Sequence, residues 1–248
     1  MLRRRDRATS LAALLIGAAA SVAIVPPARA HDFLLLTGVD VTTRNNLYGY
    51  GGLITPIPWL GNTGSLAQDG FLFRLWGFGQ RIKYSREGTS TVEASGGGVE
   101  AGLGYQVVRP GWRVSGYASY VFRSFDLSPD DTRTELRRRH GVRLQIEGYV
   151  DLVSNLGIEA QFNYTANWNT YWTRVRPYYR FFGDFRAGPE FTFLGGNEFD
   201  RQRYGAHVAG LTLGPANLSL GVGADRDVRK SSTSAYFNVG ATFLFQTQ

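Results

Sequence analysis

The chain has 248 residues, is rich in glycine and aromatic residues, and contains no cysteine, which excludes disulfide bonds and thiolate metal sites. Its formal net charge is +7, but the first thirty residues hold five of the 27 basic and one of the 20 acidic residues, so the remainder carries only +3. The basic residues form no concentrated stripe with a binding motif, so nucleic acid is not expected as a partner.

The first thirty residues have the three parts of an export signal. Arginines at positions 3, 4, 5 and 7 precede an apolar run over 11–25, and Ala28-Arg29-Ala30 is a small-x-small cleavage site. The apolar run is shorter than the ~20 residues that a spanning helix needs. The sequence therefore predicts a cleaved signal peptide over 1–30 and a single barrel domain over 31–248.

Beyond this leader, apolar and polar residues alternate in one segment after another. In the clearest copy, every second residue from Leu156 to Trp168 is apolar, and the residues between them are glycine or polar. Successive side chains of a strand point to opposite faces, so each such strand has one apolar and one polar face. A soluble sandwich uses shorter strands, whereas these runs reach the ~10 residues that cross a bilayer as a tilted strand. The sequence predicts an all-β fold, a transmembrane antiparallel β-barrel of the outer membrane.

The alternation indicates twelve strands; a ten-strand alternative treats 33–54 as a less regular N-terminal section. The predicted strands are 33–41, 46–54, 70–84, 95–107, 112–125, 138–151, 156–168, 171–182, 186–194, 202–213, 216–225 and 234–245. An even number of strands puts both ends of the barrel domain on the periplasmic side.

The predicted connections alternate between short turns and longer polar stretches, as in outer-membrane barrels. The short turns are 109–111, 153–155, 182–185 and 214–216, and the longer stretches are 85–91, 125–137, 195–201 and 226–233. Residues 55–68 break this rule, because they form a long connection where a periplasmic turn is expected. Either the strand count is wrong there, or this loop folds into the lumen or meets a partner.

Charged residues share the polar face of several predicted strands. A charged residue facing lipid at the midplane costs roughly 2–4 kcal/mol for Arg or Lys, so these rows are expected to face the lumen. The predicted lumen residues, which are also candidates for glycan binding, are Arg143, Glu147, Tyr149, Glu159, Arg174, Arg176, Tyr178, Arg180 and Glu190. Two interpretations remain open: ion pairs that fill and stabilise the barrel, or a hydrophilic passage in which Tyr and Arg bind sugars. We expect Arg143, Glu147, Glu159, Arg174 and Arg176 to form one linked network.

Two tryptophans at strand ends, Trp112 and Trp168, have the outward parity and are expected in the aromatic girdles at the membrane interfaces. The three histidines are His31, His140 and His207. His140 follows a loop with Ser128, Asp130 and Asp131, but no nucleophile motif frames these residues. The acidic pairs lack the spacing of a calcium loop. We therefore expect no enzyme activity, no metal and no cofactor, with a lipid- or glycan-modifying hydrolase as the alternative.

The second half of the chain resembles the cellulose biosynthesis protein BcsS family. The resemblance rests on the segments Leu127-Ser128-Pro129-Asp130-Asp131, Gly188-Pro189-Glu190, Arg203 to Gly210, Gly221 to Asp227, and Tyr236. It extends from Asp69 to the C-terminus, with a looser fit over 46–53. It implies an exported, outer-membrane component of cellulose production with no established activity and brings no catalytic residues.

Three of these segments fall at predicted extracellular strand ends, which predicts a solvated outer mouth formed by Asp130, Asp131, Arg203, Asp225 and Asp227. Tyr204 and Trp168 are expected nearby, as rings for stacking on sugars. The expected function is to assist export or surface anchoring of the polysaccharide. The expected partners are outer-membrane lipid, cellulose and other cellulose-secretion components. A closed barrel that only scaffolds a secretion complex is a further alternative, because twelve strands lie between a filled barrel and an open channel.

Overall fold

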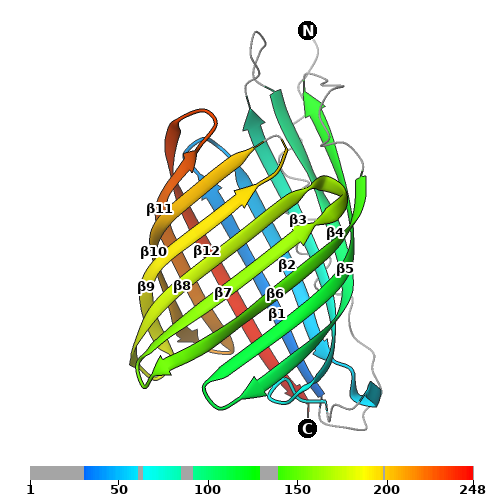
Figure 1. Ribbon diagram of the computed structural model, residues 1–248, viewed down its shortest axis with the longest axis vertical. Coiled ribbons are helices and arrows are strands. Elements are labelled where there is room, and N and C mark those ends of the chain that lie inside the picture. Colours follow the sequence, from blue (N-terminus) through cyan, green and yellow to red (C-terminus); the bar gives the residue numbers. More distant parts are fainter. Residues whose placement is uncertain (1–30, 61–63, 85–91, 129–138, 198, 248) are drawn as a thin grey trace.

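The computed structural model describes residues 31–60, 64–84, 92–128, 139–197 and 199–247, which form a closed antiparallel barrel (Figure 1). Each strand pairs with its neighbours in sequence, and β1 closes the barrel by pairing with β12. The elements are β1 (His31–Thr42), β2 (Leu47–Pro56), η1 (Pro58–Leu60), β3 (Gly70–Tyr84), β4 (Val92–Arg109), β5 (Trp112–Ser128), β6 (Arg139–Val153), β7 (Leu156–Thr165), η2 (Ala166–Trp168), β8 (Thr170–Phe182), β9 (Phe185–Gly195), β10 (Asp200–Leu213), β11 (Ala216–Asp227) and β12 (Ser232–Thr247).

The prediction of twelve strands is confirmed, and the ten-strand alternative is wrong. The first two strands are regular, because β1 pairs along its whole length with β12 and from Leu34 to Val41 with β2. The predicted leader over 1–30 lies outside the described residues. Among the residues that the structure describes, no helix is long and apolar enough to cross a membrane.

The two faces of each strand differ as the alternation predicts. On β6, Val142, Leu144 and Ile146 point outward and are exposed, whereas Gln145 between them points inward and is buried. The same order recurs on β4, where Val99 and Leu103 are exposed on the outer wall and Glu100 is buried inside. An apolar outer wall around a polar interior is the arrangement of a transmembrane barrel.

The two ends of the barrel carry different connections. The end at which His31 pairs with Thr247 is here called the terminal end, and the opposite end the loop end. The terminal end carries four short turns, which join β4 to β5, β6 to β7, β8 to β9 and β10 to β11. The long connection between β2 and β3 is also at the terminal end, and the loop end carries the other six connections, including those between β3 and β4 and between β5 and β6. This is the predicted alternation of short turns and longer loops.

The long connection between β2 and β3 folds partly into the lumen, which was one of the alternatives for residues 55–68. Leu66 is buried in an apolar cluster with Ile54, Leu72 and Tyr117, and Leu34 and Leu36 pack against this cluster. The strand count is therefore correct at this point. The segment 64–68, here called the inner segment, fills part of the lumen at the terminal end.

Buried polar groups hold the inner segment in place. The Asp32 carboxylate accepts hydrogen bonds from the Leu66 N–H at 2.7 Å and from the Ser65 hydroxyl at 3.0 Å. The Gln106 side chain donates to the carbonyl oxygens of Leu66 at 3.1 Å and Gln68 at 2.6 Å. These bonds satisfy backbone groups that would otherwise lose hydrogen bonds on burial.

Asp69 directly follows the inner segment. It accepts hydrogen bonds from the Arg109 guanidinium at 2.7 and 2.8 Å and from the Val108 N–H at 2.8 Å. The bond from Arg109, followed by the bond from Val108, lowers the pKa of Asp69. Because the pKa is lower in the folded chain, this contact contributes its stability at neutral pH and loses it only as the pH falls through the folded pKa.

The outer wall allows a direct test of membrane insertion. Leu144 lies in the middle of β6 with 54 % of its surface exposed, so Leu144→Arg would place a charge against lipid. We expect a loss of about 2–4 kcal/mol in the free energy of unfolding from liposomes, measured in urea. The control is Val153→Arg at the end of the same strand, where the cost falls to about 0–1 kcal/mol. Equal losses for both variants would contradict a lipid-facing outer wall.

Candidate functional site

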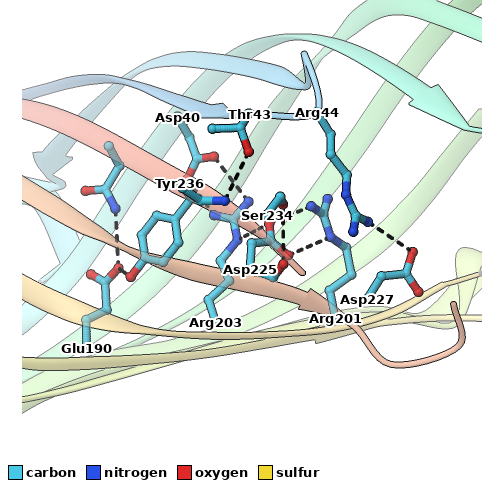
Figure 2. Close-up of polar contacts among 12 residues, drawn as sticks. Asp40, Thr43, Arg44, Glu190, Arg201, Arg203, Asp225, Asp227, Ser234 and Tyr236 are labelled. Carbon is cyan, nitrogen blue, oxygen red and sulfur yellow. Dashed lines mark hydrogen bonds and ion pairs between the residues drawn. The ribbon is translucent and has the colours of Figure 1, made fainter. Parts of the chain in front are cut away.

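The inner wall carries a cluster of buried ion pairs near the loop end (Figure 2). Asp225 of β11 is 0 % exposed and accepts hydrogen bonds from Arg201 at 2.9 and 2.5 Å and from Arg203 at 3.0 Å. Arg203 also donates to Asp40 of β1 at 2.6 and 3.2 Å. Two arginines thus neutralise two aspartates that lie 185 positions apart in the sequence (225 against 40). We call these four residues the Asp225 cluster.

Tyr236 of β12 connects the Asp225 cluster to a second group deeper in the barrel (Figure 2). Its ring lies 5.1 Å from the centre of the Arg203 guanidinium, and its hydroxyl donates to Glu190 of β9 at 2.8 Å. Glu190 also accepts a hydrogen bond from Asn238 at 3.3 Å and forms an ion pair with Arg176 of β8. Both Glu190 and Arg176 are buried.

Glu159 of β7 extends this group across the wall. Its carboxylate lies 3.7 Å from Arg176, 3.8 Å from Arg174 and 3.1 Å from Arg186. Neighbouring strands position these groups, because Glu159 is directly opposite Arg176 in the β7–β8 register. A carboxylate among three arginines is fully compensated in charge, which is how buried ionised groups are tolerated.

The predicted network is only partly continuous. Arg174 donates weakly to Gln161 at 3.4 Å, and Gln161 donates to Glu147 at 3.2 Å, so Glu147 joins the Glu159 group through an amide. Arg143 instead pairs with Glu100 of β4 at 2.7 Å, and Arg74 of β3 lies 3.7 Å from the same carboxylate. All five residues expected in one network face inward, but Arg143 belongs to a separate group with Glu100.

The remaining predicted lumen residues also face inward, closer to the terminal end. Arg180 lies 2.9 Å from Asp151, and the Tyr178 hydroxyl donates to the same carboxylate at 2.6 Å. The Arg113 guanidinium lies 5.6 Å from the Tyr149 ring. Thus every predicted lumen residue lies on the inner wall, and its polar groups are engaged mainly with other residues of the wall.

Part of the inner wall nevertheless borders unfilled space. The side chain of Arg174 is 23 % exposed and that of Glu159 is 26 % exposed, although both lie on inward faces in the middle of their strands. Exposure at this depth requires solvent-accessible space inside the barrel. The interior therefore combines fully buried ion pairs with charged side chains that border unfilled space.

Two residues that were expected in a solvated mouth are enclosed instead. Asp225 has no exposed surface, and the Arg203 side chain is only 12 % exposed, because the two residues neutralise each other within the Asp225 cluster. Asp227 is the last residue of β11 and lies 4.0 Å from Arg44; Figure 2 marks this contact with a dashed line. Asp130 and Asp131 lie outside the described residues. Asp225 and Arg203 thus belong to the inner wall and not to a contact surface.

Two of the rings expected at the mouth or girdle have other positions. Trp168 is buried and not in the outer girdle, because β7 ends at Thr165 and the turn η2 carries its ring over the Arg123 guanidinium, 3.8 Å away. Tyr204 points outward and packs edge-to-face with Phe191 and Phe193. Trp112 is exposed at the start of β5, as the girdle prediction requires.

The histidines have different surroundings. The His140 ring nitrogen lies 2.9 Å from the Tyr120 hydroxyl on the outer wall, and His31 lies 2.7 Å from the Thr55 hydroxyl. His207 is buried on the inner face of β10, and its ring nitrogens have no hydrogen-bond partner within the described ranges. Across the same ranges, no group of three or more His, Asp or Glu residues is placed to hold a metal ion.

Asp40, Arg74, Glu100 and Arg201 also belong to the inner wall, although they were not among the predicted lumen residues. A signal existed for Arg201, because it has the same parity as Arg203. Nothing local in the sequence indicates that Asp40 and Arg203 meet, because closure of the barrel brings β1 close to β10.

The fold is similar to solved outer-membrane barrels. An outer membrane channel from Pseudomonas putida F1 matches with a TM-score of 0.56 and 11% identity, covering 91% of this chain and 98% of that chain. The transport unit of the autotransporter AIDA-I from Escherichia coli matches with a TM-score of 0.52 and 10% identity, covering 98% of this chain and 100% of that chain. At these identities the likeness shows the fold alone, a transmembrane antiparallel barrel of the outer-membrane type.

Comparison of the sequence with protein families gives a match over most of the chain. The family model described as cellulose biosynthesis protein BcsS matches residues 34–245. No curated protein matches the chain. The matched range contains all twelve strands in whole or in part, including β1 and β2, where the resemblance read from the sequence was loose or absent.

Proposed function

Since the chain belongs to the cellulose biosynthesis protein BcsS family, we propose that it assists the export or surface anchoring of cellulose as a non-catalytic barrel in the outer membrane. In this proposal, residues 1–30 direct export and are removed, and residues 31–248 insert as the barrel. The family membership supports the link to cellulose production. The apolar outer wall and the outer-membrane type of the fold support the location.

The observation that carries this proposal is a lumen that is polar, charge-compensated and not completely filled by side chains. A neutral polysaccharide offers hydroxyl groups as donors and acceptors, which the exposed parts of Arg174, Glu159 and Arg186 can bind. The predicted loop residues Asp130 and Asp131 are proposed to contact emerging glucan or a surface partner. The paired charges would not repel a neutral chain, whereas an interior with charges of one sign would select a charged one.

A strain that lacks this chain tests the proposal. We expect less cellulose to be exported to, or retained on, the cell surface, and expression of the wild-type chain should restore it. Asp130→Ala with Asp131→Ala should restore it only in part at normal protein levels, because carboxylate acceptors for hydroxyl groups are lost. Unchanged cellulose export and retention in the strain without the chain would reject the proposed function.

Two alternatives lead to different measurements. A closed scaffold would show no ion conductance in planar bilayers, whereas a passage would conduct. A hydrolase would release product from lipid or glycan, and that product would disappear on substitution of His140 or His207. The His140 ring nitrogen lies 2.9 Å from the Tyr120 hydroxyl on the outer wall, and this contact gives the hydrolase no specific support.

A further inference from the structure

One part of the inner wall is aromatic and not charged. Tyr48 and Tyr50 of β2 and Trp76 and Phe78 of β3 face the lumen and are partly exposed there. The Tyr50 and Trp76 rings stack at 4.9 Å and 13°, and Tyr48 lies 5.9 Å from Tyr50 and 6.0 Å from Phe78. These four rings, here called the aromatic strip, lie outside the apolar cluster around Leu66.

Glycines beneath the rings allow them to lie against the wall. A Cβ atom added at Gly52 would lie 2.0 Å from the Trp76 ring, and one added at Gly38 would lie 2.5 Å from the Tyr50 hydroxyl oxygen. A Cβ at Gly98 of β4 would likewise lie 2.6 Å from the Phe78 ring. Any larger residue at these positions would push the rings toward the barrel axis. The glycines therefore let the Trp76, Tyr50 and Phe78 rings lie close to the wall.

Polar groups border the aromatic strip. Asp40 is directly opposite Tyr48 in the β1–β2 register, and the Arg74 guanidinium lies 4.6 Å from the Trp76 ring. The charges on the rest of the wall neutralise each other, as in the Asp225 cluster and around Glu159. A ligand that fits this lining has flat apolar faces for the rings, hydroxyl edges for the polar groups, and no net charge.

We propose that the aromatic strip is a binding track for a β-linked glucan chain inside the barrel, with Trp76 and Tyr50 as its central aromatic contacts. This inference rests on the proposed function and names the chemistry of its ligand. The flat sugar rings of such a chain carry apolar C–H faces and polar hydroxyl edges. A hydrocarbon would make no hydrogen bonds with the accessible polar groups, and an acidic polymer would meet arginines that are already paired with carboxylates, such as Arg174 and Arg186 with Glu159.

Binding of cellohexaose to the purified chain in nanodiscs, measured by isothermal titration calorimetry, tests the track. Trp76→Ala should weaken binding roughly 2- to 12-fold, the range expected for the loss of one ring contact. Gly52→Ala should also weaken binding while keeping the ring, because the new Cβ displaces it. The matched control is Trp112→Ala on the outer wall, which should bind as tightly as the wild type.

Sugar chemistry provides a test that needs no variant. Maltohexaose, whose α-linkages coil the chain, and hexagalacturonate, which is anionic, should both bind more weakly than cellohexaose. Failure of the wild-type chain to bind cellohexaose, equal affinities for all three sugars, or equal affinities of Trp76→Ala and Trp112→Ala would each overturn the track. If Trp76→Ala does not fold, Trp76→Phe and Tyr50→Leu replace it.

The outcome for the track is separable from that for the proposed function. If loss of the chain reduces cellulose export but the wild-type chain does not bind cellohexaose, the function stands and the track is wrong. If cellohexaose binds through Trp76 while cellulose export is unchanged without the chain, the track stands and the proposed function is wrong.

Discussion

Replacing Asp225 with alanine is expected to lower the free energy of unfolding by about 3–5 kcal/mol, the cost of removing one partner from a buried ion pair. Asp225 has no exposed surface and accepts hydrogen bonds from both Arg201 and Arg203. Its loss leaves Arg201 without its carboxylate and Arg203 with Asp40 alone. The measurement is the urea midpoint of the barrel in liposomes, with the mobility of unheated samples on gels as a check of folding.

Asp227→Ala is the matched control for this prediction. Asp227 is on the same strand, two positions closer to the loop end, and its nearest ion-pair partner, Arg44, is 4.0 Å away. A more exposed ion pair contributes about 0–1 kcal/mol, so this variant should unfold close to the wild type. Asp225→Asn keeps the side-chain volume and one acceptor oxygen. Its urea midpoint should therefore lie between those of Asp225→Ala and Asp227→Ala. Identical midpoints for all three variants would show that the Asp225 cluster does not stabilise the barrel.

Replacing Leu66 with alanine is expected to release the inner segment and raise ion conductance in planar bilayers. Leu66 is the apolar anchor of this segment, and truncating a buried leucine costs about 2–5 kcal/mol. Because Leu66 lies near the end of the barrel, we expect the lower value of this range, about 2 kcal/mol. This loss corresponds to a roughly 30-fold decrease in the equilibrium constant for docking of the inner segment in the lumen. The segment would then spend more time outside the lumen.

Trp59→Ala is the control within the same connection. Trp59 belongs to η1 and is 83% exposed, so its loss leaves the inner segment docked and the conductance unchanged. Gln106→Ala should reproduce part of the Leu66→Ala effect, because it removes the hydrogen bonds to the Leu66 and Gln68 carbonyls. Equal single-channel conductance of Leu66→Ala, Trp59→Ala and the wild type would show that the inner segment does not restrict the lumen.

Local pattern was sufficient to predict the barrel and the face on which most charges lie. The two-residue period places Arg174, Arg176 and Glu159 on one face of neighbouring strands, and the cost of a charge in lipid assigns that face to the interior. The pattern failed at Trp168, where the strand ends three residues early. Asn169 adopts a left-handed backbone conformation with φ 49°, and the turn carries the indole ring inward.

The order of residues along the chain was enough to predict the alternating connections, the inward direction of the charged rows and the resemblance to the BcsS family, because each depends on short-range patterns. The choice of twelve strands over ten, and the pairing of the charges, required the folded barrel. Asp40 and Arg203 pair because β1 closes on β12, and Leu66 enters the lumen because Asp32 and Gln106 bind its backbone. The aromatic strip also depends on strand pairing, since three of its rings lie against glycines of neighbouring strands. No periodicity within one strand shows what the next strand places beneath a ring.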